Sequence, residues 1–541
     1  MNRLLLYARS LRHLRPAQIV HRLFRNLPRP AVPVRPAPPM RAVRAAPVEY
    51  APRTPQLHAA TEIELLNLRA RIDGPAIWRA ADKPKLWLYQ LHYFDDLVAA
   101  NSDARRQWHR ALIDRWIAEN PPGAAIAWDP YPTSLRVVNW IKWHLAGNEL
   151  GARELASLAQ QVRYLVPRLE HHLMGNHLLE NYKTLLIAGC FFAGEEAEGW
   201  RARGLAGLRA QVAEQVLPDG AHNELAPMYH SIIAEGLLDA VNVHRVLGLD
   251  CPDWLSDAGA RMVGWGTSIE YPDGEWPQLN DSALHGVARP AQLVAYLQRL
   301  GYAPRLAASA LRTPFERRAF GNWTLLADLA NLGPDHNPGH GHADNLTYEL
   351  CVGDRRLIVD TGISTYEVND IRAQERSTAA HNTVVIDGEN SSEVWQSFRV
   401  GRRAYTTPVV GEGDPAASLA AEHDGYQHRE GAPIHRREWQ WSDQRLLVLD
   451  TIRTRGGHEL RTHIHLHPDY NAELAADGSC VVNHARDGRG IVRITSTGWT
   501  HMSVIDYEYA PGFGKRMPAQ CVELTARCSG TVRFRYKIEG L

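Results

Sequence analysis

The sequence predicts a multidomain α+β protein in which an all-α domain is followed by a large antiparallel β-sandwich domain. From about residue 58 to 317, apolar residues recur at positions i, i+3 and i+4, as in amphipathic helices. From 318 to 541, short β-branched and often alternating stretches are separated by Gly, Asp and Asn. With 541 residues, 45% of them hydrophobic, the chain is long enough for several domains with large cores. Residues 1–57 form a third region of different composition.

This first region is predicted to be a basic helical segment followed by a proline-rich strap. Residues 1–53 hold eleven Arg and one acid, a net charge of +10, so the rest of the neutral chain carries −10. Between Arg3 and Arg29, apolar residues at helical spacing alternate with Arg, which indicates one or two basic amphipathic helices. Nine prolines between Pro28 and Pro55 indicate an extended strap. We expect the helical segment to dock on the body of the protein, with membrane contact as the alternative.

No export signal is recognisable at the start of the sequence. The apolar run after Arg3 extends only from Leu4 to Tyr7, which is too short for the core of a signal peptide. No later window approaches the ~18 consecutive apolar residues of a membrane span. We therefore expect a cytoplasmic protein without a transmembrane segment, with the periplasm or secretion by another route as alternatives. The sequence leaves the oligomeric state open.

Short loops between successive helices predict antiparallel helix pairs in the α domain. Helices are expected at residues 60–72, 104–119, 135–146, 152–169, 232–247 and 293–300. Strands of the β domain are expected at residues 322–328, 346–352, 356–359, 382–386, 438–441, 446–451, 463–467, 491–496 and 531–537. Many short strands in one region of more than 200 residues are typical of a β-sandwich.

Two polar clusters lie in the helical region. The first, His171 to Tyr182, is dense in His, Asn and Glu and indicates a helix end that lines a cavity, or simply a capped helix with surface histidines. The second, Leu217 to His230, brings Tyr229 to the start of a helix after a turn. Tyr229 can act as a general acid or base only if its surroundings lower its pKa from about 10; a core tyrosine is the alternative.

Two further clusters of histidine lie in the β region. The run from His336 to Asn345 is followed by Asp360 and His381, and two imidazoles with one carboxylate are a ligand set that suits zinc. Alternation places His463, His465 and His467 on one face of a strand. Half-buried imidazoles with hydrogen-bond partners in the β-sandwich are favoured there over a metal site. The six cysteines form no CxxC pair, so neither a disulfide framework nor a cysteine-ligated zinc site is expected.

Several common chemistries lose support because their motifs are missing from the sequence. There is no P-loop, no GxGxxG, no GxSxG and no HExxH. ATP chemistry, nicotinamide redox chemistry and zincin proteolysis are therefore not expected. A nucleic-acid partner is not expected either, because the Arg-rich front region contains no recognised binding module.

In this order, the polar clusters resemble the heparinase II/III-like polysaccharide lyases. The most specific stretch begins with GHGHADNLTYEL and covers residues 339–404. The helical region is similar to the alginate-lyase-type toroid of these families through GNHLLEN, DGAHNELAPMYH and motifs at 86–97, 128–140 and 273–283. The resemblance implies an N-terminal incomplete (α/α) toroid followed by a heparinase II/III-like β-sandwich, with boundaries at 1–57, 58–317 and 318–541.

The resemblance also implies roles for individual residues. The catalytic group comprises Asn176, which neutralises the substrate carboxylate, His177 beside it, the catalytic Tyr229 and the catalytic His340. Side chains expected to bind substrate in a locally basic cleft are His92, Arg136, Glu224 and His230. The ligands of one divalent metal ion, zinc in relatives and mainly structural, are His342, Asp360 and His381.

We therefore expect a lyase that cleaves a uronic-acid-containing acidic polysaccharide by β-elimination and leaves an unsaturated uronate at the new non-reducing end. The substrate class is a heparin- or heparan-sulfate-like polymer or a bacterial exopolysaccharide. Tyr229 would serve as both base and acid when the C5 proton and the leaving O4 are syn, and His340 would be the base when they are anti. The alternatives are a non-lytic glycan-binding or polymer-assembly protein that retains the fold, and a metal-dependent hydrolase.

Overall fold

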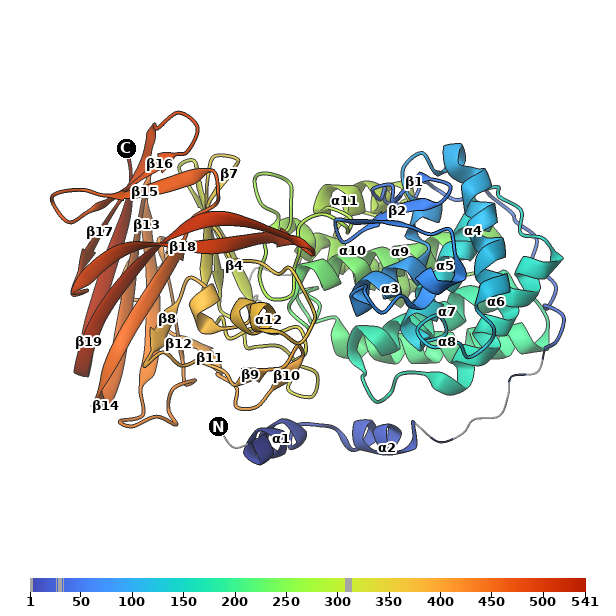
Figure 1. Cartoon of the computed structure of the whole chain (residues 1–541), viewed down its shortest axis with the longest axis horizontal. Helices are drawn as coiled ribbons and strands as arrows, with labels where there is room; N and C mark the ends of the chain where they lie inside the picture. Colours follow the sequence, from blue (N-terminus) through green and yellow to red (C-terminus); the bar gives the residue numbers. More distant parts are fainter. Residues whose placement is uncertain (1–2, 26, 28–31, 33, 307–313) are drawn as a thin grey trace.

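Nine α-helices between residues 85 and 299 build one of the two bodies in the computed structural model, which describes residues 3–25, 27, 32, 34–306 and 314–541 (Figure 1). They are α3 (Lys85–Tyr93), α4 (Arg106–Glu119), α5 (Pro130–Leu145), α6 (Ala152–Leu165), α7 (Gly175–Phe191), α8 (Glu195–Gln215), α9 (Pro227–Leu247), α10 (Asp253–Ile269) and α11 (Pro290–Arg299). Proline at the first position starts α5, α9 and α11, where its missing N–H costs nothing.

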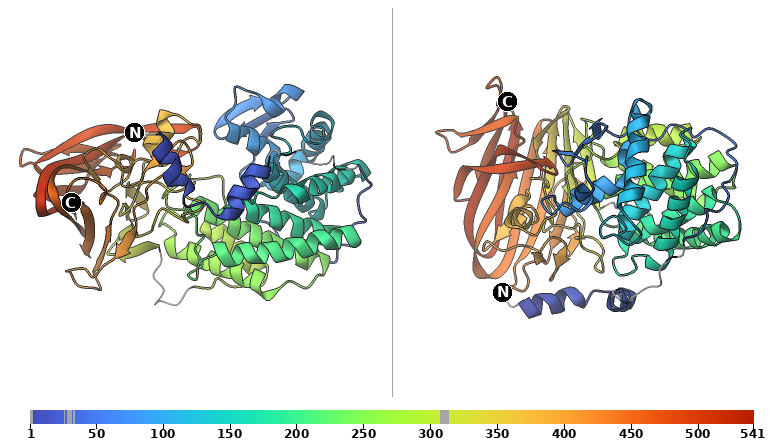
Figure 2. Two further views of the ribbon diagram at one scale, coloured as in Figure 1. Left: turned by 90° about the horizontal axis from the view of Figure 1, so that it is seen from below. Right: turned by 45° about the vertical axis from the view of Figure 1, so that its right-hand side comes forward.

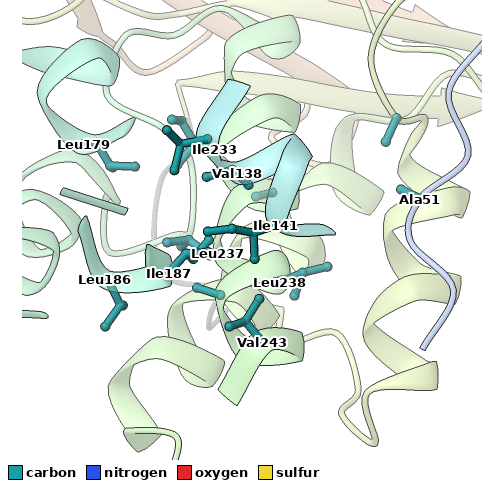
Figure 3. Close-up of a cluster of buried hydrophobic side chains, with 14 of the residues drawn as sticks. Ala51, Val138, Ile141, Leu179, Leu186, Ile187, Ile233, Leu237, Leu238 and Val243 are labelled. Carbon is teal, nitrogen blue, oxygen red and sulfur yellow. The ribbon is translucent and has the colours of Figure 1, made fainter. Parts of the chain in front are cut away.

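Three of these helices form an inner row. Side chains of α5, α7 and α9 interlock in the core of the helical body (Figure 3), and α9 is buried along almost its whole length. α7 packs against α5, α8 and α9, while α6 and α10 cover the outside of the inner helices. An inner row of apolar helices inside an outer row is the arrangement of an (α/α) toroid, so the predicted fold of this region is confirmed.

One predicted helix is wrong. Residues 57–71 form a small antiparallel sheet of β1 (Leu57–Ala59), β2 (Glu62–Leu65) and β3 (Leu68–Arg71). Leu66 and Asn67 both have positive φ angles, 52° and 58°, which is the geometry of a two-residue hairpin turn. In β2, Ile63 and Leu65 alternate as buried residues with exposed or half-buried neighbours, and this period of two decides against the helix.

The β body is a β-sandwich, as predicted, and consists of a four-stranded and a ten-stranded sheet. The small sheet has the order β4-β5-β6-β7, and the large sheet has the order β11-β12-β13-β14-β19-β17-β16-β15, with β18 on β19 and β8 on β14. The strands of the small sheet are β4 (Phe315–Phe320), β5 (Trp323–Asp328), β6 (Tyr348–Val352) and β7 (Arg355–Ile358). Those of the large sheet are β8 (Val384–Ile386), β11 (Thr406–Pro408), β12 (Ser418–His423), β13 (Ile434–Ser442), β14 (Arg445–His465), β15 (Tyr470–Leu474), β16 (Cys480–His484), β17 (Gly490–Thr497), β18 (His501–Gly512) and β19 (Lys515–Gly540).

Two of these strands are much longer than the sequence pattern indicated. The expected strand at 446–451 and the first part of that at 463–467 belong to one strand, β14, which pairs with β19 along nearly its entire length. A register shift between Arg453 and Gly457 absorbs the glycine pair that resembles a turn in the sequence. The face between the sheets is filled from both sides, for example by Trp323 and Tyr348 against Trp439 and Tyr536.

The front of the chain lies across both bodies. Helices α1 (Arg3–Leu11) and α2 (Pro16–Phe24) run below the helical body and the β body in Figure 1, and a view from below shows them crossing the junction (Figure 2). Part of the predicted strap, at residues 28–31 and 33, lies outside the described residues. Among the residues with a described structure, no helix is both long and apolar enough to cross a bilayer.

Candidate functional site

Most of the predicted catalytic residues meet at the junction of the two bodies. Asn176 lies in the first turn of α7, Tyr229 lies in the first turn of α9, and His340 lies in the loop that precedes β6. The entry into α7 is a sharp bend, because Met174 and Gly175 have φ angles of 63° and 54°. A Cβ at position 175 would lie within 2.2 Å of both the Asn337 and Glu224 side chains, so this bend requires glycine.

Asn176 is buried and fixed by a carboxylate. Its backbone N–H and its side-chain Nδ2 donate to the two oxygens of Glu224, at 2.9 and 2.8 Å. Burial raises the pKa of Glu224, but His222, His340 and Asn176 lower it by more, so the carboxylate is ionised. Glu224 was expected to bind substrate; instead both of its oxygens accept hydrogen bonds from Asn176, so it positions that residue.

His340 and Tyr229 lie face to face. Their ring centroids are 3.9 Å apart with 30° between the planes, and the Tyr229 hydroxyl is 3.2 Å from that of Tyr366. Burial raises the pKa of Tyr229, so its hydroxyl is protonated at neutral pH. The surroundings therefore do not lower this pKa as a tyrosinate base requires, and the protonated hydroxyl is a proton donor.

Asp281 orients His340. Its carboxylate accepts from His340 Nδ1 at 2.9 Å and lies 2.8 Å from His342 Nε2. Arg372 also donates to both of its oxygens, at 2.5 and 2.7 Å. Burial raises the pKa of Asp281, yet Arg372 and the two histidines hold it well below its usual range. An ionised Asp281 keeps the proton of His340 on Nδ1, so Nε2, which lies 3.8 Å from Glu224 Oε2, is the ring nitrogen that can accept a proton.

Asp281, Tyr366 and Arg372 were not predicted as site residues. Two of them lie in recognisable motifs within the stretches that carry the family resemblance: Asp281 in QLNDSA (278–283), and Tyr366 at the end of DTGISTY (360–366). Asp281 and Tyr366 both carry side chains that can transfer or orient a proton, and both lie beside a turn. This combination was the feature of the sequence that could have marked them as site residues. Arg372 lies within residues 339–404 as well, in the short helix α12 (Asp370–Glu375), but the residues around it form no recognisable motif.

His177 is held beside Asn176 by a second carboxylate. Its Nδ1 lies 3.1 Å from Glu170, and its ring packs on Tyr131 with centroids 4.3 Å apart. Burial lowers the pKa of His177, but the ion pair with Glu170 outweighs burial and raises it. His177 therefore remains partly cationic near neutral pH and can meet an anionic group.

Three predicted substrate contacts are wrong, because their side chains are buried in the helical core. Arg136 is fully buried, bonds Gln161, Thr133 and the His92 carbonyl, and stacks on Trp116. His92 lies between the Trp78 carbonyl and the Trp116 indole N–H, and burial lowers its pKa to about 3. His230 is 1% exposed and bonds the Met262 carbonyl. These residues support the inner helices and do not line the cleft.

The residues expected to bind a metal ion lie together but do not converge as a set of three. His381 Nδ1 is 2.7 Å from Asp360, and the ring centroids of His342 and His381 are 5.3 Å apart. His342 Nδ1 and His381 Nε2 are buried and have no hydrogen-bond partner within the described part of the chain, and the same holds for Asp344 Oδ2. No group of three His, Cys, Asp or Glu residues within that part is arranged to hold an ion.

A cavity of about 430 Å³ opens next to Tyr229. Aromatic side chains that line it are Tyr93, Tyr131, Tyr229, Tyr366 and Phe513. Its charged lining residues are three bases (Arg53, Lys183, Lys515) and four acids (Glu64, Asp95, Glu235, Asp239), so their formal sum, 3 − 4, is −1. The expected basic cleft is therefore not found at this cavity, whose wall is aromatic and close to neutral.

Two models of protein families match the chain. "Heparinase II/III N-terminus" matches residues 85–299, and "Heparinase II/III-like, C-terminal" matches residues 295–537. The first match coincides with the helical body, and the second begins in α11 and includes nearly all of the β body. Together the two matches span the chain from the start of α3 almost to the end of β19.

Among curated proteins, the chain is 27% identical to FtsZ-localized protein C of Caulobacter vibrioides over 532 residues, which is 91% of this chain and 86% of that protein. It is 25% identical to a heparin-sulfate lyase of Pedobacter heparinus over 357 residues, 58% of this chain and 54% of the lyase. A heparin-sulfate lyase of Bacteroides stercoris is 27% identical over 242 residues, 40% of this chain and 36% of the lyase. The alignments thus cover about half or less of these lyases.

Solved structures show the same fold. Heparinase III superposes with a TM-score of 0.65 at 17% identity, covering 86% of this chain and 79% of that one. Heparan sulfate lyase HepC from Pedobacter heparinus superposes with a TM-score of 0.55 at 17% identity, covering 97% of this chain and 87% of that one. At these identities the likeness concerns the arrangement of toroid and sandwich.

Proposed function

Because the chain belongs to the heparinase II/III-like family, we propose that it is a polysaccharide lyase that cleaves a uronate-containing polysaccharide by β-elimination. The observation that supports this most directly is the contact between Tyr229 and His340, whose rings meet face to face from the two bodies. The Tyr229 hydroxyl is protonated, and Asp281 holds the His340 ring with Nε2 as the nitrogen that can accept a proton, 3.8 Å from the Glu224 carboxylate. An acid and a base at one point are what proton abstraction and leaving-group departure require.

The C5 proton of a uronate can be removed only when the adjacent carboxylate is neutralised, so that an enolate-like intermediate forms. The second Nδ2 hydrogen of Asn176 and the imidazolium of His177 are suited to this task. Preorganised donors of this kind contribute several kcal/mol to stabilisation of developing charge. Glu170 and Glu224 hold the two donors in position before substrate binds. Their two negative charges oppose the approach of the substrate carboxylate.

The protonation states favour a division of labour between the two rings. We assign His340 Nε2 as the base that removes the C5 proton and the Tyr229 hydroxyl as the acid that protonates O4. Rings stacked 3.9 Å apart leave no space for a sugar between them, so both groups would act on the sugar from the same side. This arrangement supports syn elimination.

The cavity favours a sparsely charged substrate. Its charged lining residues sum to −1, and Arg53 is already paired with Asp95 at 2.9 Å and with Glu235 at 3.1 Å. A heavily sulfated polymer would find few unpaired cations there, whereas aromatic walls suit the apolar faces of sugar rings. Of the two substrate classes expected from the sequence, an unsulfated uronate-bearing exopolysaccharide therefore fits the cavity better than heparin.

A panel of uronate polymers tests the proposal. We expect metal-replete protein to raise the near-ultraviolet absorbance that an unsaturated uronate produces, faster on unsulfated polymers than on heparin. Product masses should show simple bond cleavage without the added water of hydrolysis. No absorbance change on any uronate polymer would contradict lyase activity, and a faster reaction on heparin would contradict the inferred preference.

A second candidate function is non-lytic glycan binding or polymer assembly. The observation in its favour is that FtsZ-localized protein C, the relative aligned over 86% of its own length, is named for its location. In that case the protein would bind the same polymers without an absorbance change, and Tyr229→Phe would leave its function intact. Binding measured by calorimetry beside the absorbance assay separates the two candidates.

We also propose that His342 and His381, with the Asp360 carboxylate, hold one divalent metal ion, zinc by ligand type. The two unpartnered buried nitrogens fit this group, although Asp360 is bonded to His381 Nδ1 in the present arrangement. The bound ion would supply positive charge and a cross-link between three segments of the β body. His342 also lies 2.8 Å from Asp281, so these ligands would fix the carboxylate that orients His340.

Metal analysis of the purified protein tests this site. We expect about one equivalent of zinc, and we expect His342→Ala and His381→Ala each to remove most of it and to lower the unfolding temperature. His463→Ala is a matched control, because His463 is also buried with an unpartnered Nδ1 among the described residues. Zinc retained in both ligand variants, or lost equally in the control, would contradict the assignment.

A further inference from the structure

Helices α1 and α2 expose an unusual amount of apolar surface. Nine of the 22 exposed large apolar side chains in the described part of the chain lie between residues 4 and 27. They are Leu4, Leu5, Tyr7, Leu11, Ile19, Val20, Leu23, Phe24 and Leu27. The side chains of Leu4 and Leu23 are 78% and 71% exposed. A docked amphipathic helix normally buries such residues and exposes its polar ones.

The contacts of α1 and α2 with the two bodies are mainly polar. Arg9 pairs with Glu393 at 2.5 Å, and Arg15 pairs with Glu214 at 2.7 Å. Gln18 is 3% exposed and donates from Nε2 to the carbonyl of His336 at 3.0 Å. Two side chains of α1 make apolar contacts: Leu6 is 5% exposed, and the Tyr7 ring packs edge-on against Trp395 with centroids 4.9 Å apart. Polar side chains thus provide most of the contacts that fix the helices to the protein, and most of the apolar side chains remain exposed to solvent.

The same surface is strongly basic. Residues 3–25 contain six Arg and no acid, and the exposed ones include Arg3, Arg12 and Arg22. Arg399 of the β body adds to this charge. Burial of Arg22, and next to it the positive charge of the nearby Arg399, lower the pKa of the Arg22 guanidinium. Leucines and Phe24 beside clustered arginines match a surface that is both apolar and anionic.

We propose that α1 and α2 bind the surface of an anionic lipid bilayer, with their exposed apolar side chains in the interfacial region and their arginines at the headgroups. A second copy of the chain would also cover the apolar residues, but a symmetric pair would place the same arginines of both copies against each other. An anionic lipid surface offers apolar contact to the leucines and negatively charged headgroups to the arginines at the same time.

Binding of α1 and α2 to a bilayer would bring the functional site close to the membrane. Gln18 of α2 bonds His336, four residues before His340 in the same loop, and the view from below shows α2 at the junction of the two bodies (Figure 2). Bilayer binding through these helices would hold the cleft near polymers at that surface. It does not depend on lyase activity, so the two can be tested separately.

Vesicle co-sedimentation of the full-length protein tests the surface. We expect the protein to bind vesicles of phosphatidylcholine with about one third phosphatidylglycerol and to bind pure phosphatidylcholine at least tenfold more weakly. Leu5→Glu with Leu23→Glu should weaken binding to the anionic vesicles by about tenfold or more, because charge replaces apolar contact. Arg12→Glu with Arg22→Glu should remove most of the preference for anionic vesicles.

Leu474→Glu serves as the matched control. Leu474 is 51% exposed, as Leu5 is, and is the last residue of β15. In Figure 1, β15 lies in the upper part of the β body, whereas α1 lies below both bodies. All variants are checked for wild-type thermal unfolding and for sedimentation coefficient. Wild-type protein that binds neither vesicle, or an equal loss in the control, would overturn the proposal. A dimer that Leu5→Glu with Leu23→Glu dissociates would overturn it as well, and would assign the surface to self-association.

Discussion

Tyr229→Phe is expected to lower kcat on the preferred uronate polymer by about 10²–10⁴-fold, with little change in polymer affinity. The variant loses only the hydroxyl, which is the proposed donor to the leaving O4. The ring that packs 3.9 Å from His340 stays in place, so the wall of the cleft is preserved. The measurement is the initial rate of absorbance increase across substrate concentrations, with affinity determined separately by calorimetry.

Two neighbouring tyrosines provide the comparison for this variant. Tyr366→Phe removes the hydroxyl 3.2 Å from that of Tyr229 and should have a smaller effect, because it acts only through Tyr229. Tyr93→Phe changes a tyrosine that lines the same cavity and should leave the rate close to wild type. If Tyr229→Phe keeps more than about a tenth of the wild-type kcat, another group donates the proton and the assignment is wrong.

The fold class could be predicted from periodicity alone, because it depends on local pattern. Helices and strands repeat their buried positions with periods of 3.6 and 2. Residues 106–119, where His109, Leu112, Ile113 and Trp116 are buried, and residues 445–454, where every second residue is buried, follow these patterns clearly. The hairpin around Leu66 was missed because it is short and its apolar residues also fit a helical spacing. The union of two predicted strands in β14 depends on its pairing with β19, which a single sequence does not specify.

The site could be predicted in part, because residue types are visible in sequence and side-chain directions are not. Asn176, Tyr229 and His340 meet at the junction, as the motifs indicated. Arg136 was misplaced because α5 belongs to the inner row, where nearly every side chain is buried, so helical periodicity gives no cleft-facing side. The role of Asp281 depends on contacts with His340 and Arg372, which lie 59 and 91 residues away in sequence.

Asp281→Asn should lower both activity and stability. Asparagine has nearly the same size, so the change removes charge without opening a cavity. The carboxylate no longer fixes the proton of His340 on Nδ1, and the expected loss in kcat is about 10²-fold or more. Arg372 is fully buried and loses its bidentate partner, so the free energy of unfolding should fall by about 3–5 kcal/mol. Steady-state rates and denaturant unfolding at several pH values measure the two effects.

The pH dependence distinguishes Asp281 from an ordinary buried side chain. Arg372, His340 and His342 hold the pKa of its carboxyl well below 3.8, so its contribution to stability is complete above that pH and is lost as the pH falls further. The stability difference between wild type and Asp281→Asn should therefore be constant near neutral pH and shrink in strong acid. Glu375→Gln is the matched control, because burial raises the pKa of this nearby carboxyl to about 7 and the amide resembles its protonated form. If Glu375→Gln lowered kcat and the free energy of unfolding as much as Asp281→Asn does, any buried carboxylate in this region would have the same effect. That result would contradict a specific role of Asp281 in positioning His340.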